Sequence, residues 1–161
     1  MGEEKMQHSS PAGITGALTD SHAPGGHPGA GHGAGVKIVS WNTTNACNMY
    51  CAHCYRDAGC KAEEELSTDE AKALLEGIAR AGFRIMIFSG GEPLMRPDIL
   101  ELVRYAAGLH LIPVFGTNGT LITPEMARKL KEAGAKGMGI SLDSLDAAKH
   151  NKFRSFEGAW E

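Results

Sequence analysis

From residue 36 onward, short runs of apolar and β-branched residues alternate with longer stretches in which apolar residues recur every three or four positions. The short runs have the length of single strands, and the longer stretches have the period of helices with one buried face. Strands and helices that alternate along a chain are typical of parallel βα units. The pattern therefore predicts an α/β fold, with strands over 36–41, 84–88, 111–115 and 137–142.

Residues with known preferences for helix ends mark the boundaries of four helices. Ser67 and Glu70 form a capping box, in which the side chain of each accepts a hydrogen bond from the backbone N–H of the other. Proline favours the first turn of a helix, and glycine favours the left-handed turn that ends one. We therefore expect helices that begin at Ser67, Pro97, Thr123 and about Asp146, and that end near Gly82, Gly108, Gly134 and Phe153.

The loops that follow the four predicted strands are polar or rich in glycine. In chain order they read NTTNACNMYCAHCY, SGGEPLM, GTNGT and SLDS, and the last three strands end near residues 88, 115 and 142, a regular spacing. In a parallel barrel or an open α/β sheet, ligands bind outside the carboxyl ends of the strands. We therefore expect the four loops to form one site.

Residues 1–35 differ from the rest of the chain, because they are rich in Gly, Pro, Ala and His and contain few large apolar side chains. Such a segment cannot bury enough apolar surface to offset the entropy that is lost on folding. We expect a disordered tail over 1–35, to whose histidines we assign no chemistry, followed by one domain over 36–161.

Charge and apolar content narrow the classes of partner. The chain of 161 residues carries a formal net charge of -3, and 42% of its residues are hydrophobic. It lacks the basic excess that binding to a nucleic-acid backbone requires. Apolar runs such as 85–88 are far shorter than the roughly 20 residues of a membrane-spanning helix. We expect a cytoplasmic protein that binds neither nucleic acid nor a membrane.

Several side chains that could take part in chemistry are assigned structural positions instead. Methionine fills irregular gaps in a core more often than it marks a site, so we expect packing roles for Met86, Met95, Met126 and Met138. His110 and His150 are expected to lie at the surface.

All four cysteines lie within residues 47–60, and three of them follow the spacing C-x3-C-x2-C. Cysteines that staple loops by disulfides are spread along a chain, so this local group points to a metal. Soft thiolate ligands select an iron–sulfur cluster, zinc or copper(I). Zinc structural sites prefer four ligands, a set that Cys60 or His53 would complete, whereas three cysteines on a [4Fe-4S] cluster would leave one iron open to a ligand.

The other three loops place polar groups beside these cysteines. Gly90 and Gly91 would let the backbone approach a ligand closely and present carbonyl groups to an ammonium group. Ser141 and Asp143 lie on the same side of a strand end, where they suit hydroxyl or carboxylate groups. Each loop also has a simpler interpretation as a turn or a helix cap, and TNG over 117–119 is typical of a turn. The occurrence of all four loops at successive strand ends favours a shared site.

Together, the cysteine spacing, GGEP, TNG and SLDS resemble the radical S-adenosylmethionine superfamily, and the resemblance covers residues 36–161. It implies the first four βα units of an incomplete (β/α)6 barrel, a partial TIM barrel. It also implies a [4Fe-4S] cluster held by Cys47, Cys51 and Cys54, with S-adenosylmethionine at the open iron. The implied contacts with the adenine, amino, carboxylate and ribose groups fall on His53, Gly90, Gly91, Glu92, Ser141, Asp143 and Arg154.

The resemblance also implies a reaction. In this superfamily one electron from the reduced cluster cleaves the sulfonium to give methionine and a 5′-deoxyadenosyl radical, which abstracts a hydrogen atom from the substrate. Residues 40–59 are similar to members that modify tetrapyrrole side chains in heme and heme d1 biosynthesis, which implies a tetrapyrrole substrate and a reductant such as ferredoxin or flavodoxin. A peptide-modifying maturase shares the same core and stays open, as does a zinc-binding structural module.

A complete core of this superfamily has six βα units, and the pattern here covers four. The resemblance therefore implies an N-terminal fragment, without the far wall of the cofactor cleft, most substrate contacts and any second cluster in a C-terminal extension. An open half-barrel would leave the strand over 137–142 as an exposed edge. We expect the chain to hold a cluster but to turn over poorly or not at all, with Cys60 outside the cluster.

Overall fold

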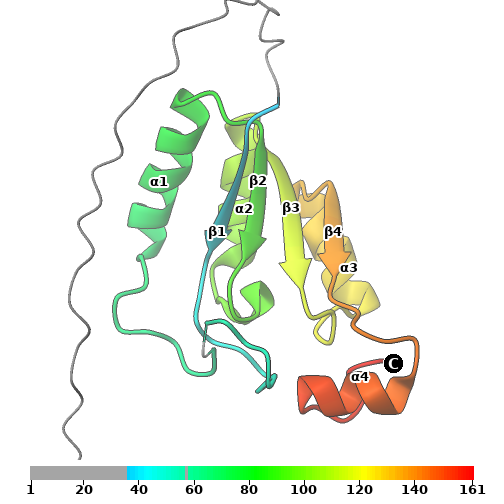
Figure 1. Ribbon diagram of the computed structural model, residues 1–161. Helices are drawn as coiled ribbons and strands as arrows, with labels where there is room; N and C mark the ends of the chain where they lie inside the picture. Colours follow the sequence, from blue (N-terminus) through cyan, green and yellow to red (C-terminus); the bar gives the residue numbers. More distant parts are fainter. Residues whose placement is uncertain (1–35, 57) are drawn as a thin grey trace, which may run out of the picture. The chain divides into compact units, whose positions relative to one another are not determined.

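The computed structural model describes residues 36–56 and 58–161. In this part of the chain four strands form a parallel sheet in the order β1-β2-β3-β4 (Figure 1). Their bounds are Ile38–Asn42 for β1, Ile85–Ser89 for β2, Ile112–Thr117 for β3 and Gly137–Ile140 for β4. A helix joins each strand to the next, so the predicted series of parallel βα units is confirmed. The predicted disorder of residues 1–35 lies outside the described residues.

The helices of the described chain fall into two groups. α1, α2 and α3 lie side by side along one face of the sheet, whereas α4 lies beyond the carboxyl ends of the strands (Figure 1). Within residues 36–56 and 58–161, no helix is long and apolar enough to cross a membrane. The bounds are Thr68–Arg80 for α1, Ile99–Gly108 for α2, Pro124–Ala133 for α3 and Ala147–Arg154 for α4, with a short 3-10 helix, η1, over Pro93–Met95.

The predicted starts of α1 and α3 agree with the structure. Ser67 caps α1 and forms the capping box with Glu70. At α3 the hydroxyl of Thr123 accepts a hydrogen bond from the N–H of Met126, and Pro124 occupies the first helical position. These local hydrogen bonds satisfy N–H groups that have no partner inside a helix.

The predicted start of α2 at Pro97 is wrong, since the helix begins at Ile99. Residues 97 and 98 form a turn, and the Asp98 side chain accepts hydrogen bonds from Arg96 and, at 2.7 Å, from the hydroxyl of Thr68 instead of capping the helix. The carboxylate that a helix cap would have used therefore pairs with Arg96 and with a residue of α1.

The predicted helix ends at three glycines agree with the structure. Gly82 after α1 and Gly134 after α3 have φ angles of 77° and 106°, in the left-handed region that favours glycine. α2 likewise ends at Gly108, but the left-handed turn after it falls on His110, whose φ is 60°. The turn at His110 directs the next residue, Leu111, into the core, where it is buried.

The core lies between the sheet and the layer formed by α1, α2 and α3. Side chains alternate along a strand, so Met86 and Phe88 of β2 and Phe115 of β3 face the helices and are buried. They pack in one cluster with buried side chains such as Leu75 of α1 and Leu102 of α2. Burial of this face specifies the register of the strands, because a shift of one residue would turn the apolar side chains outward.

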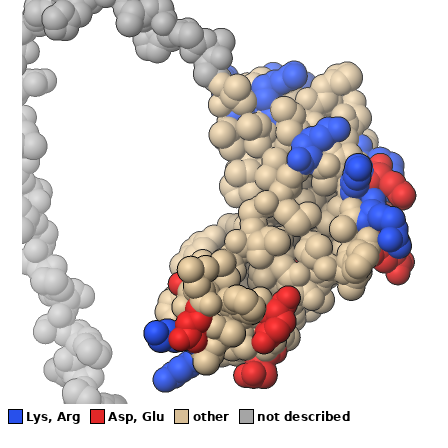
Figure 2. Space-filling model, turned by 90° about the vertical axis from the view of Figure 1, so that its right-hand side faces the viewer, with Lys and Arg blue, Asp and Glu red and all other residues tan. Residues whose placement is uncertain are grey.

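The opposite face of the sheet and the β4 edge are more exposed in the described part of the chain. Ile38 on that face is 54% exposed, and all four residues of β4 are exposed. Figure 2 looks onto the side that carries β4, α3 and α4, and shows uncharged side chains over much of it, with charged groups mainly toward its margins. Of the methionines that we expected to pack, Met86 is fully buried, but Met138 on β4 is 38% exposed.

Truncation of Leu102 should test the core. The side chain is fully buried, so Leu102→Ala removes apolar contacts and leaves a cavity, and we expect the free energy of unfolding to fall by about 2–5 kcal/mol. Leu145→Ala is the matched control, because Leu145 is exposed and its truncation should change stability by less than about 0.5 kcal/mol. Urea denaturation measures both, and similar losses in the two variants would contradict this description of the core.

Candidate functional site

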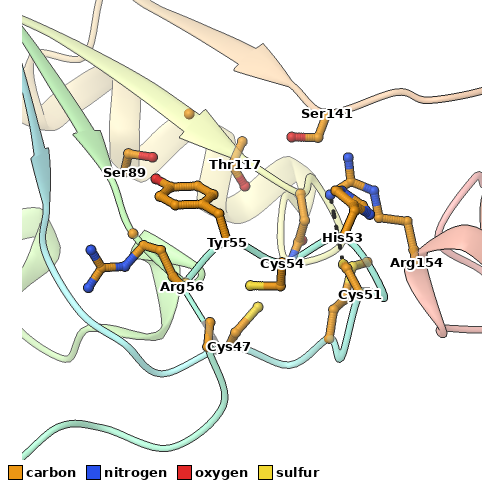
Figure 3. A pocket seen from close by; sticks show the side chains of 16 residues that line it. Cys47, Cys51, His53, Cys54, Tyr55, Arg56, Ser89, Thr117, Ser141 and Arg154 are labelled. Carbon is orange, nitrogen blue, oxygen red and sulfur yellow. Dashed lines mark hydrogen bonds between the residues drawn. The ribbon is translucent and has the colours of Figure 1, made fainter. Parts of the chain in front are cut away.

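The four strand-end loops meet at one cavity of about 270 Å³. It lies at the carboxyl ends of the strands, where the sequence predicted a shared site (Figure 3). Of the residues singled out from the sequence, those that line the cavity are Cys47, Cys51, His53, Cys54, Gly90, Gly91, Thr117, Asn118, Ser141 and Arg154. Glu92, Asp143 and Cys60 are not among its lining residues.

Three thiols occupy one side of this cavity. Figure 3 shows Cys47, Cys51 and Cys54 close together on the same loop. The N–H of Cys54 donates to the carbonyl of Cys51 at 3.0 Å, and the N–H of Cys47 donates to the carbonyl of Gly59 at 2.9 Å, so backbone hydrogen bonds close the loop. Burial raises the pKa of the Cys47 thiol. These three thiols are half-buried, whereas Cys60 is exposed.

The turn formed by Gly90 and Gly91 packs directly against the backbone of the cysteine loop. The N–H of Gly91 donates to the carbonyl of Thr44, and the N–H of Glu92 donates to the carbonyl of Ala46, both at 2.8 Å. A Cβ atom added to Gly90 would lie 2.4 Å from the Thr44 oxygen, and one added to Gly91 would lie 2.4 Å from the Ala46 oxygen. We expected these glycines to make room for a ligand. The structure shows that they first make room for the cysteine loop.

Glu92 is fully buried, does not line the cavity, and bonds to the end of β3 and the loop that follows it. Its carboxylate accepts hydrogen bonds from the hydroxyl of Thr117 at 2.9 Å, the N–H of Asn118 at 2.9 Å and the N–H of Leu94 at 3.2 Å. Burial raises the pKa of this carboxyl despite the three donors. The side chain therefore connects the second loop to the third.

Contacts made by α4 and its preceding loop form another wall of the cavity. Arg154 Nε lies 2.5 Å from the Asp143 carboxylate, and Arg154 Nη1 lies 3.9 Å from Cys51 Sγ. The rings of His53 and Phe153 stack with their centroids 4.1 Å apart. Asp143 thus holds Arg154 at the cavity and does not itself line it.

His150 corrects one expectation from the sequence. It is 1% exposed and not a surface residue, whereas His110 is exposed as expected. Its Nδ1 accepts a hydrogen bond from the N–H of Asp143 at 3.2 Å. The ring supports the loop between β4 and α4, a role that the low amphipathicity of residues 146–153 did not indicate.

Sequence reasoning missed three residues around the site. Tyr55 and Arg56 line the cavity directly after the last cysteine of the motif, and that position was the available signal. Arg96 is 5% exposed. Its Nη1 donates to the carbonyl of Thr43 and its Nη2 donates to the carbonyl of Leu66, both at 2.8 Å. A single Arg in a polar loop carries no pattern that would distinguish such a buried role.

Comparison with known proteins identifies the family. Residues 41–161 match the family model described as the Radical SAM superfamily. This chain belongs to the radical S-adenosylmethionine superfamily. The match spans three quarters of the chain and includes all four loops of the cavity.

Curated relatives show which members of the superfamily this chain is similar to. The chain is 45% identical over 126 residues to an AdoMet-dependent heme synthase of Nitratidesulfovibrio vulgaris, an alignment that covers 78% of this chain and 34% of the relative. It is 47% identical over 125 residues to an Fe-coproporphyrin III synthase of Methanosarcina barkeri, covering 77% and 31%. The chain therefore spans about a third of the length of these curated relatives.

A solved structure supports the fold. The crystal structure of Streptococcus suis SuiB bound to S-adenosylmethionine matches with a TM-score of 0.64 and 20% identity, covering 76% of this chain and 28% of that chain. At this identity the likeness concerns the fold alone. It confirms the expected part of a radical S-adenosylmethionine barrel, with four parallel strands alternating with helices.

The contact between the two loops predicts the effect of a single methyl group at Gly91. Gly91→Ala would place a Cβ within 2.4 Å of one backbone oxygen and 2.8 Å of another, so we expect the free energy of unfolding to fall by about 1–3 kcal/mol. Gly108→Ala is the control, since its Cβ meets nothing within 4 Å and alanine is favoured over glycine in a helix. Urea denaturation should show the control as stable as the parent or more so, and equal losses would refute the steric argument.

The buried carboxyl of Glu92 predicts a pH dependence. Its pKa lies above that of the same group in the unfolded chain, so the unfolded chain releases the proton first as the pH rises. The contribution of Glu92 to stability is therefore fully present below about pH 4 and decreases as the pH rises through the raised pKa. The stability advantage of the parent over Glu92→Gln should shrink as the pH rises above about 4, measured by urea denaturation at each pH.

Glu65 provides a control with the opposite sign. Burial acts to raise its pKa, but hydrogen bonds from the N–H groups of Asn45 and Ala62 and from the hydroxyl of Thr44 lower it overall. Its contribution is present above the pKa of the unfolded chain and is lost as the pH falls. The advantage of the parent over Glu65→Gln should therefore stay level as the pH rises above about 5, where the advantage over Glu92→Gln shrinks, and should fall as the pH drops below about 4. An advantage over Glu65→Gln that shrinks as the pH rises would contradict the assignment.

Proposed function

We propose that this chain forms the cluster-binding and cofactor-binding part of a radical S-adenosylmethionine enzyme, in which Cys47, Cys51 and Cys54 bind a [4Fe-4S] cluster. The observation that carries the proposal is the position of three thiols on one loop, at a cavity lined by the ends of all four βα units. Family membership supports the same cofactor. The region 36–161 then corresponds to the N-terminal part of the core domain.

The donor set of the described residues suits such a cluster. Thiolates are the ligands that iron–sulfur clusters require, and three of them leave one iron free for a further ligand. Within residues 36–56 and 58–161, no three Cys, His, Asp or Glu side chains converge on a point where one metal ion would bind. A structural zinc site takes four ligands, and Cys60, the remaining cysteine, is exposed and is not a lining residue of the cavity. The three thiols at the cavity therefore support the cluster over the zinc module.

S-adenosylmethionine would bind in the same cavity, where Cys47, Cys51 and Cys54 would hold the cluster. The backbone N–H groups of Gly91 and Glu92 are used by the cysteine loop, and this leaves the carbonyl groups of the Gly90–Gly91 turn to accept hydrogen bonds from the amino group. Because Phe153 covers one face of the His53 ring, the other face is the one that would be available to the adenine.

Ser141 and Arg154 bind the carboxylate and ribose region of S-adenosylmethionine. Both residues line the cavity, on the side formed by the loop after β4 and by α4. Asp143 acts through Arg154, which it holds by an ion pair, so its role is to position that guanidinium. Glu92 likewise acts by its backbone and by tying two loops together.

The bound cluster supplies the electron for reductive cleavage of S-adenosylmethionine, and thereby the hydrogen abstraction from the substrate. The substrate that we propose is a tetrapyrrole side chain. The similarity to synthases named for heme and Fe-coproporphyrin III supports this choice. A one-electron protein such as ferredoxin or flavodoxin delivers the electrons.

Cysteine substitutions test the cluster. After anaerobic reconstitution with iron and sulfide, the parent should contain about four irons and four sulfides and a brown absorption that dithionite bleaches. Cys51→Ala should lose most of the iron and of this absorption, because a ligand is missing. Cys60→Ala is the matched control and should keep both, since Cys60 is exposed and is not a lining residue of the cavity.

Two results would contradict the proposal. A colourless parent protein that binds one zinc ion tightly would favour the zinc module. Loss of iron in Cys60→Ala to the same extent as in Cys51→Ala would show that the cluster uses a different set of ligands.

A further inference from the structure

Two arginines line the cavity, and their surroundings differ. Figure 3 shows the Arg56 and Arg154 guanidinium groups on opposite sides of the three cysteines. Arg154 is neutralised by Asp143 and also contacts Cys51. Arg56 has neither an ion pair nor a hydrogen bond to another side chain in residues 36–56 and 58–161. One cation of the cavity is therefore compensated by the described chain and the other is not.

The Nε atom of Arg56 is buried and lacks a hydrogen-bond partner within the described residues. A buried N–H of a charged group that stays unpaired is costly, and such groups in native proteins usually mark a missing partner. The guanidinium presents N–H groups in a planar fork that matches the two oxygens of a carboxylate. The missing partner is therefore best supplied by a carboxylate of a ligand.

Tyr55 adds an aromatic surface next to this cation. Its side chain lines the cavity and is 84% exposed. Figure 3 shows the Tyr55 ring between Arg56 and Thr117, with its hydroxyl directed toward Ser89. An exposed ring of this kind offers a flat apolar face for stacking with another ring system. An apolar face and a carboxylate-binding group thus lie side by side.

We propose that Tyr55 and Arg56 form the substrate side of the cavity, where Arg56 binds a carboxylate of the substrate and Tyr55 packs against its ring system. The inference rests on the proposed tetrapyrrole function and goes beyond it by assigning the residues that recognise the substrate. The two arginines of the cavity then bind different molecules. Arg154 binds S-adenosylmethionine, and Arg56 binds a propionate group of the tetrapyrrole.

Binding of two matched porphyrins tests this assignment. Coproporphyrin III carries four carboxylates, and its tetramethyl ester has the same macrocycle without their charges. The reconstituted protein with S-adenosylmethionine is titrated with each compound in the same detergent, and binding is followed by the change in porphyrin absorption. The parent should bind the free acid more tightly than the ester.

Substitution of Arg56 should affect the free acid selectively. Arg56→Gln should weaken binding of coproporphyrin III by about ten-fold or more, because a charge-assisted pair is lost, and should leave binding of the ester unchanged. Arg56→Lys keeps the charge without the planar fork and should give an intermediate affinity. Arg128→Gln, on the exposed surface of α3, is the matched control and should bind both porphyrins as the parent does.

The possible failures can be told apart. If Arg56→Gln binds coproporphyrin III like the parent, the role of Arg56 is refuted while the tetrapyrrole function stands. If the parent shows no saturable binding of coproporphyrin III, both the inference and the proposed substrate are refuted. If Arg56→Gln loses iron or affinity for S-adenosylmethionine to the same degree as porphyrin binding, Arg56 supports the cofactors and the substrate role is refuted.

Discussion

The cysteine loop and the Gly90–Gly91 turn pack backbone against backbone, and the geometry of the site depends on this contact. Hydrogen bonds of 2.8 Å join Gly91 to Thr44 and Glu92 to Ala46, at a distance that leaves no room for a side chain on either glycine. β2 is anchored in the core through Met86 and Phe88. The contact therefore fixes the cysteine loop, which has few buried apolar side chains of its own, to a rigid strand of the sheet. The contact thereby positions the loop that carries the three thiols.

Two buried charged side chains, those of Arg96 and Glu92, connect the loops of the site to one another. Arg96 binds the carbonyl groups at residues 43 and 66 together with Asp98, and its guanidinium lies 5.5 Å from the centre of the Trp41 ring. Glu92 joins the second loop to the third through Thr117 and Asn118. Each of these groups is costly to bury alone and favourable only when all its partners are in place, so the loops are coupled. Such coupling holds ligand-binding groups in place before a ligand arrives.

The cavity has two chemically distinct sides. On the side of α4, the Asp143 carboxylate orients Arg154, and the stacked rings of His53 and Phe153 join α4 to the cysteine loop. On the other side, Tyr55 and Arg56 present an exposed ring and a cation whose Nε has no partner among the described residues. This difference is the physical basis for assigning one side to the cofactor and the other to a substrate carboxylate.

The sequence by itself determined the order of the strands and helices, the capped starts of α1 and α3, and the presence of three thiols at a strand end. These features depend on periodicity, on local hydrogen bonds and on spacing, all of which lie within a few neighbouring residues. Only the tertiary structure decided the roles of Glu92, Asp143 and His150, and the start of α2. The carboxylates of Glu92 and Asp98, for example, accept hydrogen bonds from Thr117 and Thr68, which are distant from them in sequence. The choice of partner depended on which groups the folded sheet brought within hydrogen-bonding distance.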